Sequence, residues 1–421
     1  MIDKQHSAID LDNLRFDVEI SEITTSFDFE RLRRWPEPES TSLQAFDATD
    51  TLILDLAATL VLSNDALFGG KVDPQKIVVL NENFGAVSLP LARFARDSGK
   101  KWNVIAWSDS ISRERAVSNN ANNLEVSSPV AISDSLEEVL GDAVVILIQA
   151  PRSHSELHQM IETAHRVAGG NAVVLVGGRV KYLTTAVNDL LGRYFSEVRA
   201  SRARAKSRVI VANVKRDPVQ AKVKEYPRIE SHEVHGVNLL VAAYGATFGG
   251  AKIDPGTRFF LETLPKLFSR TDLVPHEIVD LGCGNGTISA FVASKFKEFE
   301  GQIIATDSSR DAVLATAETA RLNQLSHRIR AVRDDAMSRI DDESHDLILL
   351  NPPFHVGNTV DPNIAVKLFK ASARVLKENG ELWCVWNSHL HYKGELNRLV
   401  GPTTEIARNR KFTITRTIKV R

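Results

Sequence analysis

Short apolar runs alternate with amphipathic stretches along most of the chain. The runs cover residues 51–62, 77–80, 102–107, 144–148, 172–176 and 209–212 in the first half, and 277–281, 301–306, 329–332, 346–350, 380–386 and 411–420 in the second. Short runs rich in β-branched residues, separated by helical spacers, predict mostly parallel strands connected by helices. We therefore expect an α/β protein with two doubly wound, Rossmann-type sheets. The second should hold six or seven strands, with 411–420 as its closing edge strand.

The two strand series divide the chain into halves of similar length. Its 421 residues exceed the usual range of a single domain. A charged, proline-containing segment, residues 215–236, lies between the two series and has the composition of a linker. The predicted organisation is an N-terminal extension (1–45), a first domain (46–214), the linker and a second domain (237–421). The sequence from Asp254 to Leu261 predicts a helix across the entrance of the second domain.

Three landmarks recur in the two halves at nearly constant spacing. The pairs are Gly85 and Gly286, Asp109 and Asp307, and Pro151 and Pro353, which lie 201, 198 and 202 positions apart. Such spacing indicates a tandem duplication. In the first half, however, asparagines replace Gly282 and Gly284, and Gln149-Ala150-Pro151 replaces Asn-Pro-Pro. We therefore expect the first domain to be a degenerate copy that has lost its chemistry.

Composition narrows the class of protein without indicating a ligand. With 43% hydrophobic and 25% charged residues, the chain is typical of a soluble globular protein. Its formal net charge of −1 neither supports nor excludes binding to nucleic acid. The two cysteines, Cys283 and Cys384, cannot form a disulfide framework or a four-ligand zinc site, and no metal is expected. A reducing cytoplasm is the simplest setting, and no run of roughly 18 apolar residues predicts a membrane span.

The run 346–350 ends in the rigid turn Asn351-Pro352-Pro353-Phe354. Open α/β sheets bind ligands at the carboxyl ends of their strands. A nucleobase amine or an amide nitrogen is a poor nucleophile because its lone pair is delocalised. The Asn351 side-chain oxygen and the Pro352 carbonyl can accept its two N–H groups and direct the lone pair outward, while Phe354 can stack on a planar base. Alone, the motif is equally compatible with a strand terminator whose Phe354 caps the core.

Three other strand ends carry signals of a nucleoside-containing cofactor. The sequence from Asp280 to Gly286 is a strand that runs into a glycine loop and a helix, although a dinucleotide site or a plain turn would also suit it. Asp307 can accept hydrogen bonds from ribose hydroxyls, or can cap a helix. Asp335-Ala336 can hold an adenine amino group, or can belong to a solvated acidic loop shared with Asp334. The order of these signals on successive strands, ahead of Asn351, favours the cofactor interpretation.

This ordered series resembles the class I S-adenosylmethionine-dependent methyltransferases, and the Asn-Pro-Pro-Phe turn resembles the subset that methylates amine or amide nitrogens. The second half is similar to the guanine-N2 ribosomal RNA methyltransferases, in which a degenerate methyltransferase-like domain precedes a catalytic one. The residues that carry this similarity are 351–355, 364–375, 379–382, 387–392 and 406–412. The segments 387–392 and 409–412 resemble the large-subunit enzymes more than the small-subunit enzymes. The sequence departs from the family at 356–358 and in its longer N-terminus.

The resemblance implies a role for each candidate residue. For the cofactor S-adenosylmethionine, it implies contacts from Asp280, Gly282, Gly284 and Gly286 to the methionine part, from Asp307 to the ribose, and from Asp335 and Ala336 to the adenine, with Asn351 bordering the site. For catalysis on guanine N2 it implies Asn351, Pro352, Pro353 and Phe354. The expected substrate is 23S ribosomal RNA. The alternatives are 16S ribosomal RNA, a protein glutamine amide, a DNA adenine amine, or a non-catalytic RNA-binding assembly factor.

Ribosomal RNA is the expected partner, and two groups of basic residues are candidates for holding it. They are Arg199, Arg202, Arg204, Lys206 and Arg208 in the first domain, and Arg408, Arg410 and Lys411 in the second. RNA docking is a task that the degenerate domain can retain after losing its cofactor site. The alternative is that these residues form ordinary solvated faces. No membrane partner is expected, and the oligomeric state stays open, with a monomer as the expectation.

Overall fold

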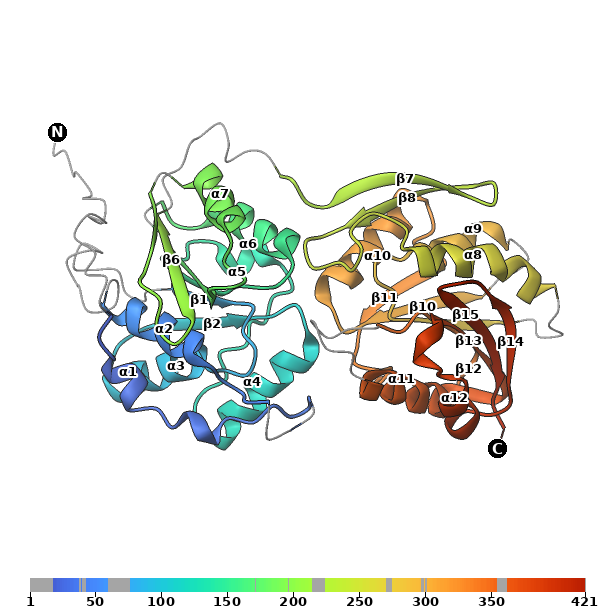
Figure 1. Cartoon of the computed structure of the whole chain (residues 1–421), viewed down its shortest axis with the longest axis horizontal. Coiled ribbons are helices and arrows are strands. Elements are labelled where there is room, and N and C mark those ends of the chain that lie inside the picture. Colours follow the sequence, from blue (N-terminus) through green and yellow to red (C-terminus); the bar gives the residue numbers. More distant parts are fainter. Residues whose placement is uncertain are drawn as a thin grey trace. The chain divides into compact units, whose positions relative to one another are not determined.

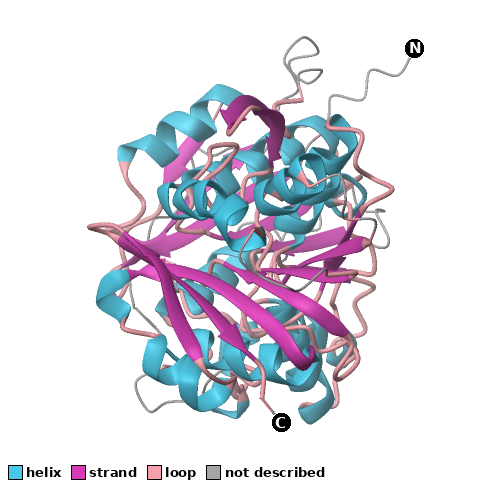
Figure 2. Cartoon of the chain, turned by 90° about the vertical axis from the view of Figure 1, so that its right-hand side faces the viewer, coloured by secondary structure: helices cyan, strands magenta, loops and turns pink. Residues whose placement is uncertain are grey.

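The computed structural model divides the chain into two compact units, Met1–Glu225 and Tyr226–Arg421 (Figure 1). The structure describes residues 18–37, 39, 43–59, 76–170, 172–195, 197–213, 224–269, 275–296, 299, 301–353 and 362–420. Each unit contains its own sheet with helices on both faces (Figure 2). The predicted α/β class with two doubly wound sheets is therefore confirmed.

The first unit is organised around a six-stranded sheet with the strand order β2-β1-β3-β4-β6-β5. Its strands are β1 (Lys76–Leu80), β2 (Asn103–Trp107), β3 (Val145–Gln149), β4 (Val173–Arg179), β5 (Val198–Ala200) and β6 (Ser207–Asn213). Its helices are α1 (Glu22–Thr25), η2 (Phe29–Arg31), α2 (Ala48–Ala57), α3 (Ser88–Asp97), α4 (Ile111–Asn123), α5 (Leu136–Leu140), α6 (His154–Val167) and α7 (Thr185–Tyr194). Strands β1 to β4 pair in parallel, and β6 runs antiparallel to β4 and β5.

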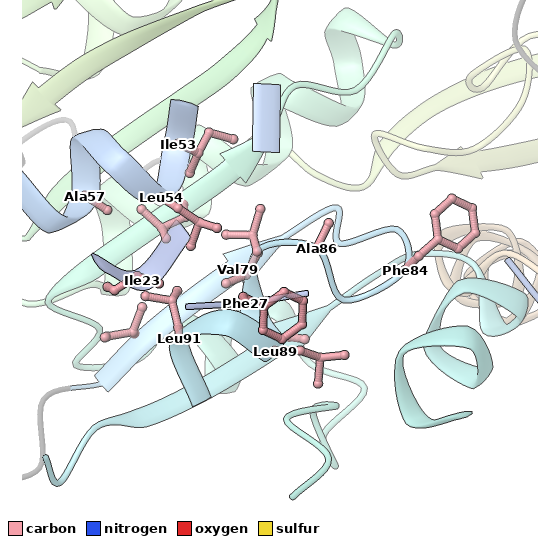
Figure 3. Close-up of a cluster of buried hydrophobic side chains, with 14 of the residues drawn as sticks. Ile23, Phe27, Ile53, Leu54, Ala57, Val79, Phe84, Ala86, Leu89 and Leu91 are labelled. Atoms are coloured by element: carbon pink, nitrogen blue, oxygen red, sulfur yellow. The ribbon is translucent and has the colours of Figure 1, made fainter. Parts of the chain in front are cut away.

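Alternate residues of the central strands enter two separate hydrophobic cores. Val79 and Leu147 face the core formed with α1 to α4, whereas Val78 and Ile146 face the core formed with α5 to α7. Figure 3 shows part of the first core, where side chains of α2 and β1 gather. This period of two is the geometry of strands buried on both faces, and it explains why their sequences are continuous apolar runs.

One predicted strand of the first half is a helix. Residues 48–57, which lie largely inside the apolar run 51–62, form α2. Asp47 caps this helix by accepting a hydrogen bond from Thr49 N at 2.6 Å, and Asp50 accepts one from Asp47 N at 2.7 Å. The reciprocal cap and the leucine-rich composition favour a helix over a strand. The prediction of a strand rested on the apolar run alone.

The N-terminal residues of the described chain pack onto α2. Ile23 and Phe27 are buried in the first core. The buried carboxylate of Asp55 accepts hydrogen bonds from Ser21 N at 2.9 Å and from Thr24 Oγ1 at 2.6 Å, and it also pairs with Arg204. The described part of the predicted extension thus contributes to the core of the first unit.

The second unit contains a seven-stranded sheet with the order β11-β10-β9-β12-β13-β15-β14 and a separate β7–β8 hairpin. Its strands are β7 (Arg228–Val234), β8 (Val237–Ala243), β9 (Glu277–Leu281), β10 (Gln302–Asp307), β11 (Ile329–Arg333), β12 (His345–Leu350), β13 (Leu376–Asn387), β14 (Thr403–Arg408) and β15 (Phe412–Ile418). Its helices are α8 (Pro255–Phe268), α9 (Thr287–Lys295), α10 (Arg310–Leu322), α11 (Pro362–Val375), η5 (Ser388–Leu390) and α12 (Lys393–Leu399). The hairpin contacts α8, α9 and α10, and it includes residues 228–234 of the predicted linker.

The edge of the second sheet differs from the prediction. Strand β15, which corresponds to the run 411–420, lies between β13 and β14, so the prediction that it closes the sheet is wrong. The edge strand is β14, whose residues are mostly exposed or half-buried. Because an edge strand with few buried residues lacks a continuous apolar run, its sequence gave no strong signal.

The two sheets share one topology. In each, the chain builds outward on one side of the first strand, continues on the other side of that strand, and ends with an antiparallel pair of strands at the far edge. The counterpart of β11 in the first unit is reduced to an isolated parallel bridge between Ala106 and Val130. This shared order supports the tandem duplication predicted from the spacing of the landmarks.

Candidate active site

The predicted site residues of the second unit gather at the carboxyl ends of four adjacent parallel strands. Gly282 follows β9, Asp307 ends β10, Asp334 follows β11 and Asn351 follows β12. Backbone hydrogen bonds connect neighbouring ends, from Gly282 N to Thr306 O at 2.8 Å and from Asp334 N to Asp307 O at 2.9 Å. In open α/β sheets this edge is where ligands bind.

The glycine loop has a backbone that side chains would obstruct. Gly282, Gly284 and Gly286 have φ angles of 75°, 54° and 76°, in the left-handed region. A Cβ at Gly282 or Gly284 would meet no atom within 4 Å, so the backbone there faces open space. A Cβ at Gly286 would lie 2.9 Å from Thr316 Cα, so this glycine instead allows close contact with α10. The first two glycines suit a ligand, and the third suits packing.

Asp280 lies beneath this loop and has one unsatisfied oxygen. Its buried carboxylate accepts hydrogen bonds through Oδ2 from Ser289 N at 3.1 Å and Ser289 Oγ at 2.6 Å. Its Oδ1 is buried and has no partner among the described residues. Burial raises the pKa of Asp280 to about 6, the Asp307 charge adds to the rise, and the Ser289 hydrogen bonds oppose it. An unsatisfied buried acceptor beside open backbone fits the cationic ammonium of an amino-acid moiety.

Asp307 is held against the glycine loop. Its Oδ2 accepts a hydrogen bond from Gly284 N at 3.1 Å, and its Oδ1 accepts one from Ser309 N at 2.9 Å. The alternative of a helix cap does not hold, because the N-cap of α10 is Ser309, whose hydroxyl accepts from Ala312 N at 3.1 Å. A half-buried carboxylate fixed at a strand end is an acceptor of the kind that binds ribose hydroxyls.

Asp335 and Asp334 have different surroundings. Asp334 is buried and accepts hydrogen bonds from Asp335 N and Arg339 N, both at 2.8 Å. Asp335 pairs with Lys367 Nζ at 2.6 and 2.7 Å, and its side chain is 13% exposed. The two residues therefore do not form the solvated acidic loop considered as the alternative. The next residue, Ala336, has a left-handed φ of 51°.

Asn351 has a fixed amide with a free carbonyl oxygen. Its Nδ2 donates to Asp254 Oδ2 at 3.1 Å and to Thr257 Oγ1 at 2.9 Å. Its Oδ1 is buried and has no partner among the described residues. Because a carboxylate oxygen only accepts, Asp254 determines which atom of the amide is the nitrogen and leaves the oxygen facing away from α8. This is the acceptor that the chemistry of an Asn-Pro-Pro turn requires.

The rest of the motif is only partly described. Pro352 is buried and Pro353 is exposed. Phe354 and His355 lie outside the described residues, so the predicted stacking role of Phe354 has no structural counterpart here. The site therefore combines a described acceptor, Asn351, with a proline turn that fixes the direction in which the chain leaves β12.

Sequence reasoning missed the two residues that orient Asn351. Asp254 caps α8, accepting from Gly256 N at 3.2 Å and Thr257 N at 2.8 Å, and the same carboxylate holds the Asn351 amide. The predicted helix across the entrance is confirmed as α8. An aspartate directly before a proline and two positions before a glycine is a typical helix start, so its capping role could have been found. Its contact with a residue 97 positions away could not.

The first unit repeats this arrangement in a closed form. Gln149, at the end of β3, donates through Nε2 to Asp50 in the first turn of α2, as Asn351 donates to the first turn of α8. Its Oε1, however, accepts from Asn83 N at 3.1 Å and from Asn83 Nδ2 at 3.0 Å. Asn81 keeps a left-handed φ of 56° where the second unit has Gly282. Side chains thus fill the space that is open in the second unit, in agreement with a lost cofactor site.

Two family models and several relatives match the chain. The Methyltransferase small domain model matches residues 238–416, and the RLMG N-terminal domain model matches residues 20–216. A ribosomal RNA large subunit methyltransferase G from Shewanella denitrificans is 30% identical over 391 residues, which cover 92% of this chain and 96% of the relative. One from Pseudomonas syringae pv. syringae is 31% identical over 385 residues, covering 91% and 96%. This chain belongs to the ribosomal RNA large subunit methyltransferase G family.

A solved structure shares the fold of this methyltransferase G family member. It is a 16S rRNA guanine-N2 methyltransferase from T. Thermophilus in complex with AdoMet and guanosine, with a TM-score of 0.67 and 18% identity, covering 83% of this chain and 90% of that chain. The resemblance to the guanine-N2 ribosomal RNA methyltransferases, with the large-subunit branch preferred, is confirmed by the family assignment.

Among the described residues, no three His, Cys, Asp or Glu side chains are grouped so that they could hold a metal ion. No helix in the described part of the chain is long and apolar enough to cross a bilayer.

Proposed function

We propose that this chain transfers a methyl group from S-adenosylmethionine to the exocyclic N2 amine of a guanine in large-subunit, 23S ribosomal RNA. Membership in the methyltransferase G family supports the reaction and the RNA class. The observation that carries the proposal is Asn351, whose amide nitrogen is bound by Asp254 and Thr257 while its carbonyl oxygen has no partner among the described residues. A primary amine on a planar base is a donor that this oxygen can accept.

The residues around the glycine loop fit the cofactor. The unsatisfied Asp280 Oδ1 suits the α-ammonium, the open backbone at Gly282 and Gly284 leaves room for the methionine part, and Asp307 suits the ribose. Asp335 and Ala336 remain the proposed adenine contacts. When bound, S-adenosylmethionine supplies an electrophilic methyl group on a sulfonium centre.

Asn351 acts on the nucleophile. Its Oδ1 accepts one N–H of the guanine amine, and the Pro352 carbonyl accepts the other, which favours a pyramidal nitrogen with its lone pair directed outward. As positive charge develops on this nitrogen, the hydrogen bond to Asn351 Oδ1 strengthens, so it stabilises the transition state more than the ground state. The methylated amine then loses a proton readily, so no strong base is required. Phe354 is proposed to stack on the base.

Methyl transfer from radiolabelled S-adenosylmethionine tests the proposal. Purified full-length chain is incubated with RNA extracted from a strain lacking the gene, and the labelled RNA is separated by size and digested to nucleosides. We expect label in 23S RNA as N2-methylguanosine, and loss of label with Asn351→Ala, while the variant still binds the cofactor in titration calorimetry. Label in 16S RNA, protein or DNA would show that this molecule, and not 23S RNA, is the substrate. Absence of cofactor binding by the natural chain would favour an RNA-binding assembly factor.

Two properties accompany the proposal. An enzyme of ribosomal RNA is expected in the cytoplasm, and both cysteines of this chain are free and buried, as suits a reducing compartment. We also propose a monomer as the active form, since each unit carries its own core and the proposed site draws on the second unit alone. Sedimentation of the purified chain measures its oligomeric state.

A further inference from the structure

The carboxyl edge of the first sheet carries exposed basic and aromatic side chains beside the filled site. They are Arg152, Lys181, Tyr182 and Lys206, here called the Tyr182 surface. Tyr182 is 40% exposed, and its ring centroid lies 4.6 Å from Lys181 Nζ and 5.7 Å from Arg152 Cζ. The Lys181 ammonium and, less strongly, the Arg152 guanidinium lower the pKa of the Tyr182 hydroxyl. An aromatic ring is therefore displayed in a locally positive field.

The backbone holds this surface in one arrangement. Tyr182 N donates to Arg179 O at 2.8 Å, which closes the turn after β4, and Val180 N donates to Lys206 O at 2.9 Å, which connects that turn to the β5–β6 hairpin. A Cβ at Gly178 would lie 3.1 Å from both the Ala150 side chain and the Leu183 side chain, so the glycine allows the loops after β3 and β4 to meet. The backbone of this surface therefore loses little conformational entropy when a ligand binds.

The corresponding edge of the second unit is the one assigned to substrate. Arg152 follows Gln149-Ala150-Pro151 in the sequence as Phe354 follows Asn351-Pro352-Pro353. The bond from Val180 N to Lys206 O matches the one from Ser388 N to Lys411 O at 2.8 Å, which connects the end of β13 to the β14–β15 hairpin. Exposed basic residues, Arg410 and Lys411, occupy that hairpin as well. In the first unit, side chains therefore occupy the space that corresponds to the cofactor site. Its basic residues remain at the edge that corresponds to the proposed substrate-binding edge of the second unit.

We propose that the Tyr182 surface binds a single-stranded segment of ribosomal RNA, with one base stacked on Tyr182 and phosphates contacted by Arg152, Lys181 and Lys206. Exposed rings flanked by cations are the means by which proteins bind single strands, since every base has a π face and every linkage a negative charge. The inference rests on the proposed function, because it takes ribosomal RNA as the ligand. The basic residues predicted to hold RNA in the first unit are thereby reduced to a defined surface. Arg204 is left out because it pairs with Asp55.

RNA binding by the full-length chain tests the stacking contact. The probe is a fluorescently labelled, single-stranded oligoribonucleotide of mixed sequence, and the readout is its anisotropy. Tyr182→Ala should weaken binding about tenfold, within the range known for loss of one base–aromatic stack. Tyr182→Phe, which keeps the ring, should bind like the natural chain. Equal affinity for Tyr182→Ala and the natural chain would overturn the proposal.

Salt dependence tests the phosphate contacts. The double variant Arg152→Ala/Lys181→Ala should lower the slope of log affinity against log salt by up to about 1.4, as expected for two contacts to a single strand. The matched control is Lys100→Ala/Lys101→Ala, an exposed basic pair that precedes β2 at the opposite, amino end of the strands. An equal change of slope in the control would mean that general charge, and not this surface, binds the RNA, and would overturn the proposal.

Methylation kinetics separate this proposal from the proposed function. If the function is correct and the surface docks RNA, Tyr182→Ala should raise the KM for 23S RNA with kcat unchanged. If the natural chain methylates 23S RNA and Tyr182→Ala leaves KM unchanged, the surface proposal fails alone. If the natural chain methylates no RNA while Tyr182→Ala still weakens binding of the oligoribonucleotide, the proposed function fails and the RNA surface stands.

Discussion

The amide nitrogen of Asn351 and the hydroxyl of Thr257 are joined by a hydrogen bond of 2.9 Å between residues 94 positions apart in the sequence. Asn351 directly follows the central strand β12, and Thr257 lies in the first turn of α8. With the additional bond to Asp254, the first turn of α8 fixes the plane of the amide. The carbonyl oxygen of Asn351 therefore has a defined direction before any substrate arrives, which is the condition for electrostatic preorganisation.

Thr257→Val should slow the reaction, whereas loss of a different hydroxyl in the same helix should not. The substitution removes the hydroxyl that holds Asn351 and keeps the shape of the side chain. Loss of one hydrogen bond costs about 1 kcal/mol, so kcat should fall up to about tenfold, with cofactor affinity unchanged and the melting temperature lowered no more than in the control. Single-turnover methylation measures the effect. The control is Thr263→Val, which removes a hydroxyl bonded to Phe259 O in the same helix. An unchanged rate for Thr257→Val would contradict a positioning role.

Asp307→Ala should weaken cofactor binding more than it slows methyl transfer. The substitution removes the proposed acceptor for the ribose hydroxyls and the acceptor for Gly284 N. We expect the dissociation constant of S-adenosylmethionine to rise about 10- to 100-fold, in line with the loss of one or two charge-assisted hydrogen bonds. Titration calorimetry measures this constant, with the exposed Asp341→Asn as control. Similar affinities for the two variants would exclude Asp307 from the cofactor site.

Cofactor affinity should decrease as the pH falls through about 6. Burial raises the pKa of Asp280 to about 6, so its carboxyl is ionised above this pH and neutral below it. Protonation removes the charge proposed to hold the cofactor ammonium, and it therefore competes with binding. In Asp280→Asn, binding should be weaker above this pH and should no longer vary across the window. A pH-independent affinity of the natural chain would contradict the assignment.

Asp50 should make the first unit less stable as the pH rises. Burial, together with the Asp47 charge, raises the pKa of Asp50 from 3.8 to about 8. Between these values the unfolded chain has released the proton that the folded chain retains. The contribution of Asp50 to the unfolding free energy therefore falls across this window, by at most about 1.4 kcal/mol per pH unit.

Asp50→Asn should remove this dependence. The unfolding free energy of the variant minus that of the natural chain should increase from about pH 4 to about pH 8 and then level off, because only the natural chain has the carboxyl that titrates. Urea unfolding at a series of pH values measures the difference. A difference that stays constant with pH would show that the buried carboxyl is not protonated in the fold.

Periodicity predicted most of the fold because strands buried on both faces are continuous apolar runs. It failed for α2, where the cap formed by Asp47 and Asp50 outweighs an apolar run, and for β14, which is too exposed to produce one. The strand-end residues Gly282, Asp307 and Asn351 were predicted because each lies directly after an apolar run. Asp254 and Thr257 were not, because their role depends on contacts across about 95 positions, which no local pattern encodes.

The filled site of the first unit also limits its evolution. Gln149 Oε1 satisfies both nitrogens of Asn83, and Asp50 receives the amide of the same glutamine. Replacement of Gln149 by the shorter asparagine would therefore remove the partner of both Asp50 and the Asn83 nitrogens, at a cost of roughly 1–3 kcal/mol. Because this step toward an open site lowers the stability of the first unit, loss of the site in the first copy is difficult to reverse.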